Sequence, residues 1–238
     1  MCKRMLSYAA NLKNEVTDVD WYSPQQEVTG VDHPDHDREH IPKELNLISD
    51  QQRKDAVAYA KATNSSSVLA LKHGRVVFEW YALGRSIFST TNSMSMAKTV
   101  LALLVGIAID EGVFKDKHSD ENSRIGKWMP EWNDDERGDI TIDQLLRMQS
   151  LFDFNEKITA TSDMAHMHFT PNLREFVLQT RIRPNPEDRQ KFQYSNINAQ
   201  VLGIVLERAT NKHYYHYLSE KIWKPMGLRS ASVWLDKK

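Results

Sequence analysis

Residues 91–112 read TNSMSMAKTVLALLVGIAIDEG. We expect the rest of the chain to be organised around this segment. A polar start leads into residues 100–109, which are apolar on nearly every helical face, so the helix is expected to be buried on all sides. Ser95 and Lys98 stand three residues apart at its start and are therefore neighbours on one helical face. A hydroxyl beside an amine at a helix start is an arrangement that serine acyl-transfer chemistry can use.

The composition describes an ordinary globular protein, with 40% apolar and 26% charged residues among 238. A net charge of −1 without a basic stripe argues against nucleic acid or an anionic membrane as partner. The single cysteine excludes an internal disulfide. No apolar run reaches the roughly 20 residues that span a bilayer.

The first residues lack the apolar core of a signal peptide, so the chain as given is expected to be cytoplasmic. A periplasmic location becomes the expectation if the native N-terminus is missing. The oligomeric state is left open.

Residues 1–45 are polar, turn-rich and aperiodic, and we expect an N-terminal arm there, followed by one domain over residues 46–238. Within the arm, residues 32–40 (DHPDHDREH) place three histidines among four acids. Imidazoles and carboxylates are common metal ligands, whereas a solvated loop is the simpler interpretation. Pro34 argues against a helix that would align these side chains, so no metal or other cofactor is expected.

The elements before and after the quoted stretch predict an α+β protein. A capping box at Ser49 and Gln52 opens a helix to about Thr63, and residues 67–72 and 75–81 form an antiparallel hairpin. Residues 93–227 are predominantly helical, without a convincing further strand pair. Within this part we predict one helix after Thr141 and another after Asn172. Two further helices are predicted over residues 197–209 and 214–223. Residues 229–235 are β-like again, so we expect an antiparallel sheet with a large helical insertion, most of whose later strands are missing.

The pairing of Ser95 with Lys98 is not evidence by itself. With 18 serines and 17 lysines, chance predicts about 1.3 S-x-x-K matches, and the sequence contains one. The sequence also contains one Y-x-N match, at Tyr194 and Asn196, where chance predicts roughly 0.4 matches. The positions of both matches are more informative than their occurrence.

Ser95 lies at a helix N-terminus, where unpaired N–H groups and the positive end of the helix dipole favour a negatively charged nucleophile. Lys98 is carried inward with the apolar helix. A free lysine has a pKa of about 10.4 and acts as a base only after burial or a cationic neighbour lowers it. Tyr194 precedes another helix start, from which its hydroxyl could pass a proton to a leaving group.

In these two motifs the chain resembles the serine β-lactamase and penicillin-binding protein superfamily. Ser95-Met-Ala-Lys98 resembles its first motif, and Tyr194-Ser-Asn196 resembles its second motif in the form used by class C β-lactamases and related esterases. Further matching segments occur in the expected order, namely IAIDEG at 107–112, WMPE at 128–131, ITIDQLL at 140–146, FQYSN at 192–196 and IWKPMG at 222–227. The branch it most resembles is that of the 6-aminohexanoate-oligomer hydrolases.

Three departures from the family pattern stand out. Leu151 follows Ser150 where a glycine is common, and residues 184–191 replace a Pro-Gly before the tyrosine. The third motif, K/H-x-G on a strand after Tyr194, is absent, because Lys72-His73-Gly74 is better explained as a hairpin turn. In the family that strand supplies one N–H of the oxyanion hole, a group worth a few kcal/mol in the transition state.

The resemblance implies a serine hydrolase that needs no cofactor. Ser95 would attack, Lys98 would take its proton, Tyr194 would shuttle that proton, and Asn196 would orient the substrate or the lysine. β-Lactams, D-amino-acid peptides, linear oligoamides and carboxylic esters all suit this chemistry. A catalytically inactive binding or sensor protein, or an incomplete fragment, are the alternatives.

Overall fold

A computed structural model describes residues 19, 21–31, 48–115, 122–157, 159, 161–185, 187 and 191–236. The proposed arm and its histidine-rich segment, residues 32–40, lie mostly outside these residues. The chain divides into two compact units, one containing residues 48–92 and the other containing residues 21–31 and 93–236.

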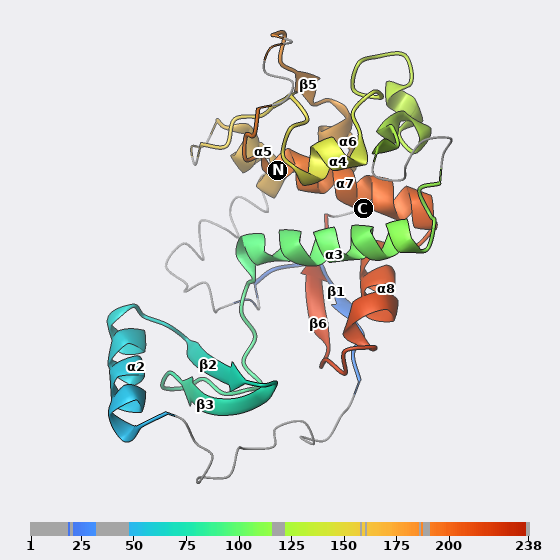
Figure 1. The fold of residues 1–238 in the computed structure, drawn as a ribbon. Coiled ribbons are helices and arrows are strands. Elements are labelled where there is room, and N and C mark those ends of the chain that lie inside the picture. The colour runs from blue at the N-terminus through green and yellow to red at the C-terminus, as the bar shows by residue number, and fades with distance from the viewer. Residues whose placement is uncertain are drawn as a thin grey trace. The chain divides into compact units, whose positions relative to one another are not determined.

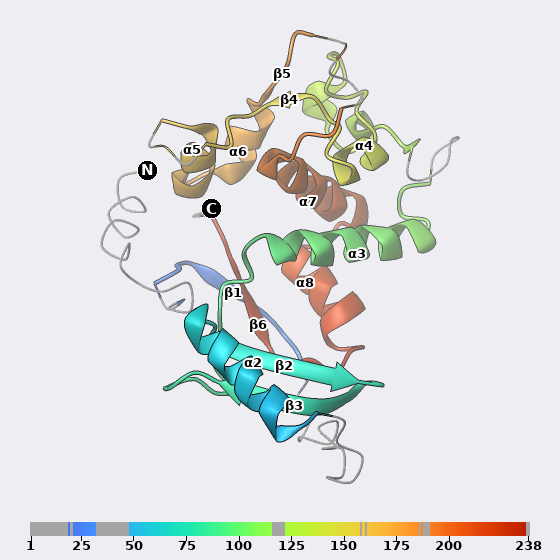
Figure 2. The same cartoon turned by 60° about the vertical axis from the view of Figure 1, so that its left-hand side comes forward.

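The unit of residues 48–92 consists of one helix and a hairpin, as the sequence predicts (Figure 2). Helix α2 (Asp50–Ala62) begins with the predicted capping box, in which Ser49 and Gln52 exchange hydrogen bonds. Strands β2 (Ser67–Lys72) and β3 (Arg75–Tyr81) pair antiparallel. His73 and Gly74 form the two-residue turn with φ of 50° and 77°, the left-handed conformations that such a turn requires.

Two helices form the centre of the second unit, α3 (Ala97–Asp110) and α7 (Asn196–Thr210) (Figure 1). Helix α7 packs against α3 on one side and against α4 (Ile142–Leu146) and α6 (Leu173–Leu178) on the other. Helix α7 therefore connects α3 to the smaller helices.

Short elements complete this unit, and the sequence predicts some of them. The helix predicted over residues 214–223 is α8 (Tyr214–Leu218), which continues as a π-helical turn, η7 (Ser219–Trp223). The capping box at Thr141 opens α4, and the Asn172 side chain caps α6. The other short elements are the 3₁₀ turns η2 (Met94–Met96), η4 (Ile125–Lys127) and η5 (Pro130–Trp132) and the helix α5 (Asp163–Phe169).

Helix α3 is not buried on all sides, so this expectation is wrong. Leu101, Leu104, Val105 and Ala108, spaced three or four residues apart, form its buried face. On another face Leu103 is 57% exposed. Uniform hydropathy therefore does not reveal that only one side of this helix packs against α7.

The strand pairs also differ in part from the expectation. The predicted terminal strand forms as β6 (Ala231–Trp234), but it pairs antiparallel with β1 (Gln25–Val28), in a segment that the sequence assigns to an aperiodic arm. A second unpredicted pair joins β4 (Phe152–Asp153) and β5 (Arg181–Ile182). Two-residue strands carry too little alternation to be recognised. In the described chain, no helix has the length and apolar character needed to cross a membrane.

A partly exposed ion pair holds the C-terminal end of α7. Both terminal nitrogens of Arg208 donate to the carboxylate of Glu131, at 2.7 and 2.6 Å, and Arg208 also donates to the Trp128 carbonyl. The Arg208 hydrogen bonds lower the pKa of Glu131 from 4.5 to about 2. A lowered pKa in the folded state means that this contribution to stability is present above about pH 4.5 and is lost as the pH falls through about 2.

We predict that Glu131→Gln lowers the free energy of unfolding by about 1 kcal/mol at pH 7, a value discounted for solvent screening of a partly exposed pair. The cost should shrink as the pH falls from 4.5 towards 2, because wild type then loses the same charge. Urea unfolding at pH 7 and pH 3 checks this, with the exposed Glu187→Gln as the control. An equal cost at both pH values would show that the ion pair contributes no pH dependence.

Candidate active site

Ser95 and Lys98 stand at the start of α3, where the sequence places them. Ser95 lies in η2 (Met94–Met96), and Lys98 follows in the first turn of α3. Because three residues separate them, their side chains lie on one face, and Lys98 Nζ donates to Ser95 Oγ at 3.2 Å. Ser95 is exposed and Lys98 is half-buried.

The spacing of Tyr194 and Asn196 follows from the backbone at Ser195, which is extended with φ −151° and ψ 128°. In an extended segment, residues two apart point to the same side. Ser195 points the other way and is only 4% exposed. The extended entry into α7 therefore presents Tyr194 and Asn196 on the same side.

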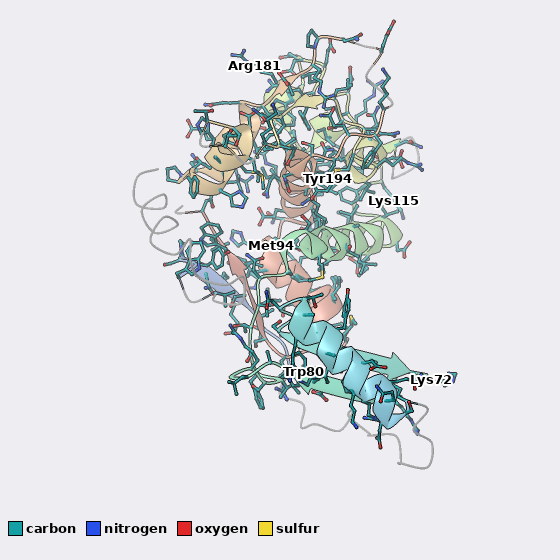
Figure 3. All side chains as sticks on the ribbon, turned by 90° about the vertical axis from the view of Figure 1, so that its left-hand side faces the viewer. Lys72, Trp80, Met94, Lys115, Arg181 and Tyr194 are labelled. Atoms are coloured by element: carbon teal, nitrogen blue, oxygen red, sulfur yellow. The ribbon has the colours of Figure 1, made fainter. Side chains whose placement is uncertain are left out.

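The four predicted site residues converge on one point. Tyr194 OH lies 2.7 Å from Ser95 Oγ, and Lys98 Nζ donates to Asn196 Oδ1 at 2.6 Å. Lys98 Nζ also lies over the Tyr194 ring, 5.1 Å from its centroid. Figure 3 shows Tyr194 between α7 and α3, with Met94 near the start of α3. Residues about a hundred positions apart thus form one hydrogen-bonded cluster.

The electrostatics of the cluster act on the Tyr194 hydroxyl. Burial raises the pKa of Tyr194, whereas hydrogen bonding to Lys98 and Ser95 and the charge of Lys98 lower it. The lowering prevails, so the pKa of Tyr194 lies below its usual 10. The Glu156 carboxylate acts in the opposite direction and raises this pKa. The phenolic proton is therefore easier to remove than that of a free tyrosine.

Glu156 is the member of the cluster that the sequence does not predict. Its carboxylate accepts hydrogen bonds from the Asn196 backbone N–H at 2.5 Å and from Asn196 Nδ2 at 2.6 Å. It lies on the loop between β4 and α5, 40 residues before Asn196. No sequence motif identifies Glu156, because its contact with Asn196 depends on how this loop folds back to the start of α7.

The departure at Leu151 has a structural counterpart. Leu151 has a φ of 69° and Met148 has a φ of 58°, both in the left-handed region. A non-glycine residue there costs on the order of 1 kcal/mol, which explains why glycine suits this position. The segment nevertheless connects to the site, because the Gln193 N–H donates to the Met148 carbonyl at 2.9 Å.

Four methionines of this unit lie in different environments. Met167 is buried, whereas Met94 and Met96 are 57% and 69% exposed. Met164 Sδ accepts a hydrogen bond from Asn196 Nδ2 at 3.3 Å, so this residue contacts the cluster rather than only filling space.

A separate cavity of about 750 Å³ is lined by residues 135–137 and 178–184, and it contains none of the cluster residues.

Comparisons with known proteins agree with the resemblance. A family model described as Beta-lactamase matches residues 51–238. The 6-aminohexanoate-dimer hydrolase of Paenarthrobacter ureafaciens is 25% identical over 189 residues, covering 74% of this chain and 46% of that protein. The chain thus spans about half the length of this curated relative.

Two solved structures share the fold. A candidate 6-aminohexanoate-dimer hydrolase from Bacillus anthracis superposes with a TM-score of 0.75 at 17% identity, covering 95% of this chain and 62% of the other. FmtA from Staphylococcus aureus gives a TM-score of 0.57 at 21% identity, covering 79% and 53%. At these identities the likeness establishes the β-lactamase-like α+β fold alone.

Proposed function

We propose, from the premise that the chain belongs to the beta-lactamase family, that it carries the nucleophile of a serine hydrolase that cleaves an amide or an ester through an acyl-enzyme. One observation carries the proposal. Ser95 Oγ lies within hydrogen-bond distance of both Tyr194 OH and Lys98 Nζ, at 2.7 and 3.2 Å. A nucleophile beside two groups that can exchange a proton is what acyl transfer requires.

In acylation, Ser95 Oγ attacks the substrate carbonyl carbon and its proton passes to Lys98 Nζ. The carbonyl oxygen becomes negatively charged, and the Ser95 N–H at the helix start is our candidate for one donor to it. When the tetrahedral intermediate collapses, the C–N or C–O bond to the leaving group breaks. Tyr194 then gives its proton to the leaving group and recovers one from Lys98.

Deacylation repeats these steps with water in place of Ser95. A water molecule attacks the acyl carbon and loses a proton to the cluster, and the Ser95 Oγ–acyl bond breaks. The proton returns to Ser95 Oγ, so the acid product leaves and the enzyme is restored. Asn196 orients the lysine through the 2.6 Å hydrogen bond that its Oδ1 accepts.

A second assignment of the base deserves a test, because Tyr194 OH is closer to Ser95 Oγ than Lys98 Nζ is. In this assignment a Tyr194 phenolate takes the serine proton directly and Lys98 remains charged. The lowered pKa of Tyr194 favours it. The two assignments predict different pH dependence once Lys98 is replaced.

The substrate class that we propose first is a linear amide or a simple carboxylic ester. The name of the Paenarthrobacter relative indicates hydrolysis of a 6-aminohexanoate dimer, which is a linear amide. Esters share the carbonyl chemistry and have a better leaving group, so they should report the same nucleophile at a higher rate.

The proposal predicts that the protein releases p-nitrophenol from p-nitrophenyl butyrate in a burst of about one equivalent, followed by slower turnover. The burst arises because acylation releases the alcohol before water frees the acyl group. The same preparation is assayed with the 6-aminohexanoate dimer and with a chromogenic cephalosporin to rank the substrate classes.

Failure of all three substrates, in a protein that unfolds cooperatively, would favour a binding or sensor protein that keeps the fold without turnover. A broad, non-cooperative melt together with inactivity would favour an incomplete fragment. Either outcome contradicts the proposed hydrolase.

A further inference from the structure

We propose that Glu156 is a positioning residue for acylation: it holds the Asn196 side chain in the orientation that presents Oδ1 to Lys98. This inference rests on the proposed function and assigns a role to a residue outside the two motifs. Glu156 has no hydrogen bond to Ser95 in the described structure; besides its electrostatic effect on Tyr194, it reaches Ser95 through Asn196 and Lys98.

The hydrogen-bond pattern fixes which way the Asn196 amide faces. An asparagine side chain has an oxygen that only accepts and a nitrogen that only donates. Glu156 accepts from Asn196 Nδ2 at 2.6 Å, which leaves Oδ1 to accept from Lys98 Nζ at 2.6 Å. With the amide reversed, Asn196 Oδ1 would face the carboxylate and Nδ2 would face the lysine, and both contacts would be lost.

The second hydrogen bond anchors the carboxylate to the backbone. Glu156 also accepts from the Asn196 backbone N–H at 2.5 Å, at the first turn of α7. That N–H is among those that a helix leaves unpaired at its start. A two-point contact restricts both the carboxylate and the amide, and charge-assisted hydrogen bonds are roughly twice as strong as neutral ones.

The two residues before Glu156 are held by contacts with α6 and α5. Phe154 is buried and makes an edge-to-face contact with Phe176 of α6. The Asn155 N–H donates to Asp163 at 2.8 Å, and its carbonyl accepts from the Met164 N–H at 3.2 Å. The carboxylate is therefore presented from a fixed position rather than from a free loop.

The proposed consequence concerns the geometry of proton transfer. Lys98 Nζ reaches Ser95 Oγ at 3.2 Å while it is also bonded to Asn196. If the Asn196 amide turns or shifts, Lys98 follows it or loses its partner. A misplacement of about 1 Å near reacting groups costs roughly 10²-fold in rate.

The test measures acylation by a fluorophosphonate probe in wild type and in Glu156→Gln. Gln has the same shape, but its one oxygen can accept only one of the two hydrogen bonds at this site and its nitrogen faces a donor. We expect the acylation rate constant to fall by roughly 10-fold to 100-fold, with the dissociation constant of the noncovalent probe complex changing less than about twofold. Asp153→Asn, a nearby exposed carboxylate on β4, is the matched control and should keep the wild-type rate.

A double-mutant cycle separates positioning from a general loss of fold. If Glu156 acts through Asn196, then Glu156→Gln should change the rate less than about twofold in the Asn196→Ala background. The Asn196 backbone amide proton, strongly deshielded by a short hydrogen bond to a carboxylate, should move upfield in Glu156→Gln. The shift reports loss of the hydrogen bond, whereas a merely structural role would leave the effect of Glu156→Gln on the rate undiminished in the Asn196→Ala background.

The outcomes are distinguishable. If the probe acylates wild type and Glu156→Gln equally fast, the positioning role is overturned and the proposed function stands. The same conclusion follows if the rate effects of Glu156→Gln and Asn196→Ala multiply in the double variant. Wild type that no probe acylates overturns the proposed function and the positioning role together. The inference is supported if Glu156→Gln slows acylation, if this effect falls below about twofold in the Asn196→Ala background, and if the Asn196 amide resonance shifts.

Discussion

We expect Ser95→Ala to reduce ester and amide hydrolysis by at least about 10³-fold. The side chain that this substitution removes is the one group at the centre of the cluster, which Tyr194 and Lys98 both contact. Loss of a nucleophile abolishes the covalent route, and the residual rate reflects binding alone. The measurement is kcat for p-nitrophenyl butyrate in wild type and variant.

Ser93→Ala is the matched control for this prediction. Ser93 lies two residues before Ser95, is exposed, and makes no capping hydrogen bond with its side chain. Its removal should leave kcat within about twofold of wild type. If the two alanine variants retain equal activity, the nucleophile has been assigned to the wrong residue.

We expect Lys98→Met to reduce kcat by about 10²-fold to 10⁴-fold, the range typical of a lost general base. Methionine keeps much of the length of the side chain but offers no nitrogen to Ser95 or Asn196. The same substitution should raise the pKa of Tyr194, because the hydrogen bonding and charge of Lys98 lower it in wild type. Ultraviolet titration of the variant against Lys98→Met/Tyr194→Phe isolates the Tyr194 signal.

The pH profile of Lys98→Met decides which group is the base. If Lys98 takes the serine proton, the loss persists across the pH range in which the protein is folded. Activity that returns as the pH rises through the elevated pKa of Tyr194 would instead assign the base to Tyr194. Lys115→Met, an exposed lysine beyond the other end of α3, should leave both the activity and this pKa unchanged.

Local sequence signals predicted the local structure well. The capping boxes at Ser49 and Thr141 open helices, and the two-residue turn at His73 and Gly74 closes the hairpin. These features depend on residues within a few positions of each other, so spacing is sufficient to recognise them. The convergence of the two motifs depends on α3 packing against α7, which the family resemblance implied and spacing alone did not.

Contacts between distant segments account for what the sequence did not reveal. Strand β1 forms because it pairs with β6 across about 200 positions, and its own four residues have no distinctive pattern. Glu156 reaches Asn196 only because its loop returns to the start of α7. The uniform hydropathy of α3 conceals which side is covered, since a helix with one buried face and an apolar opposite face looks the same as a fully buried one.

The most direct test of the central claim is the mass of the intact protein after incubation with a fluorophosphonate probe, followed by peptide mapping. The proposed function predicts one adduct per chain on the peptide that contains Ser95, and no adduct in Ser95→Ala. Equal labelling of wild type and Ser95→Ala, or an adduct on a different residue, would contradict the assignment of Ser95 as the nucleophile.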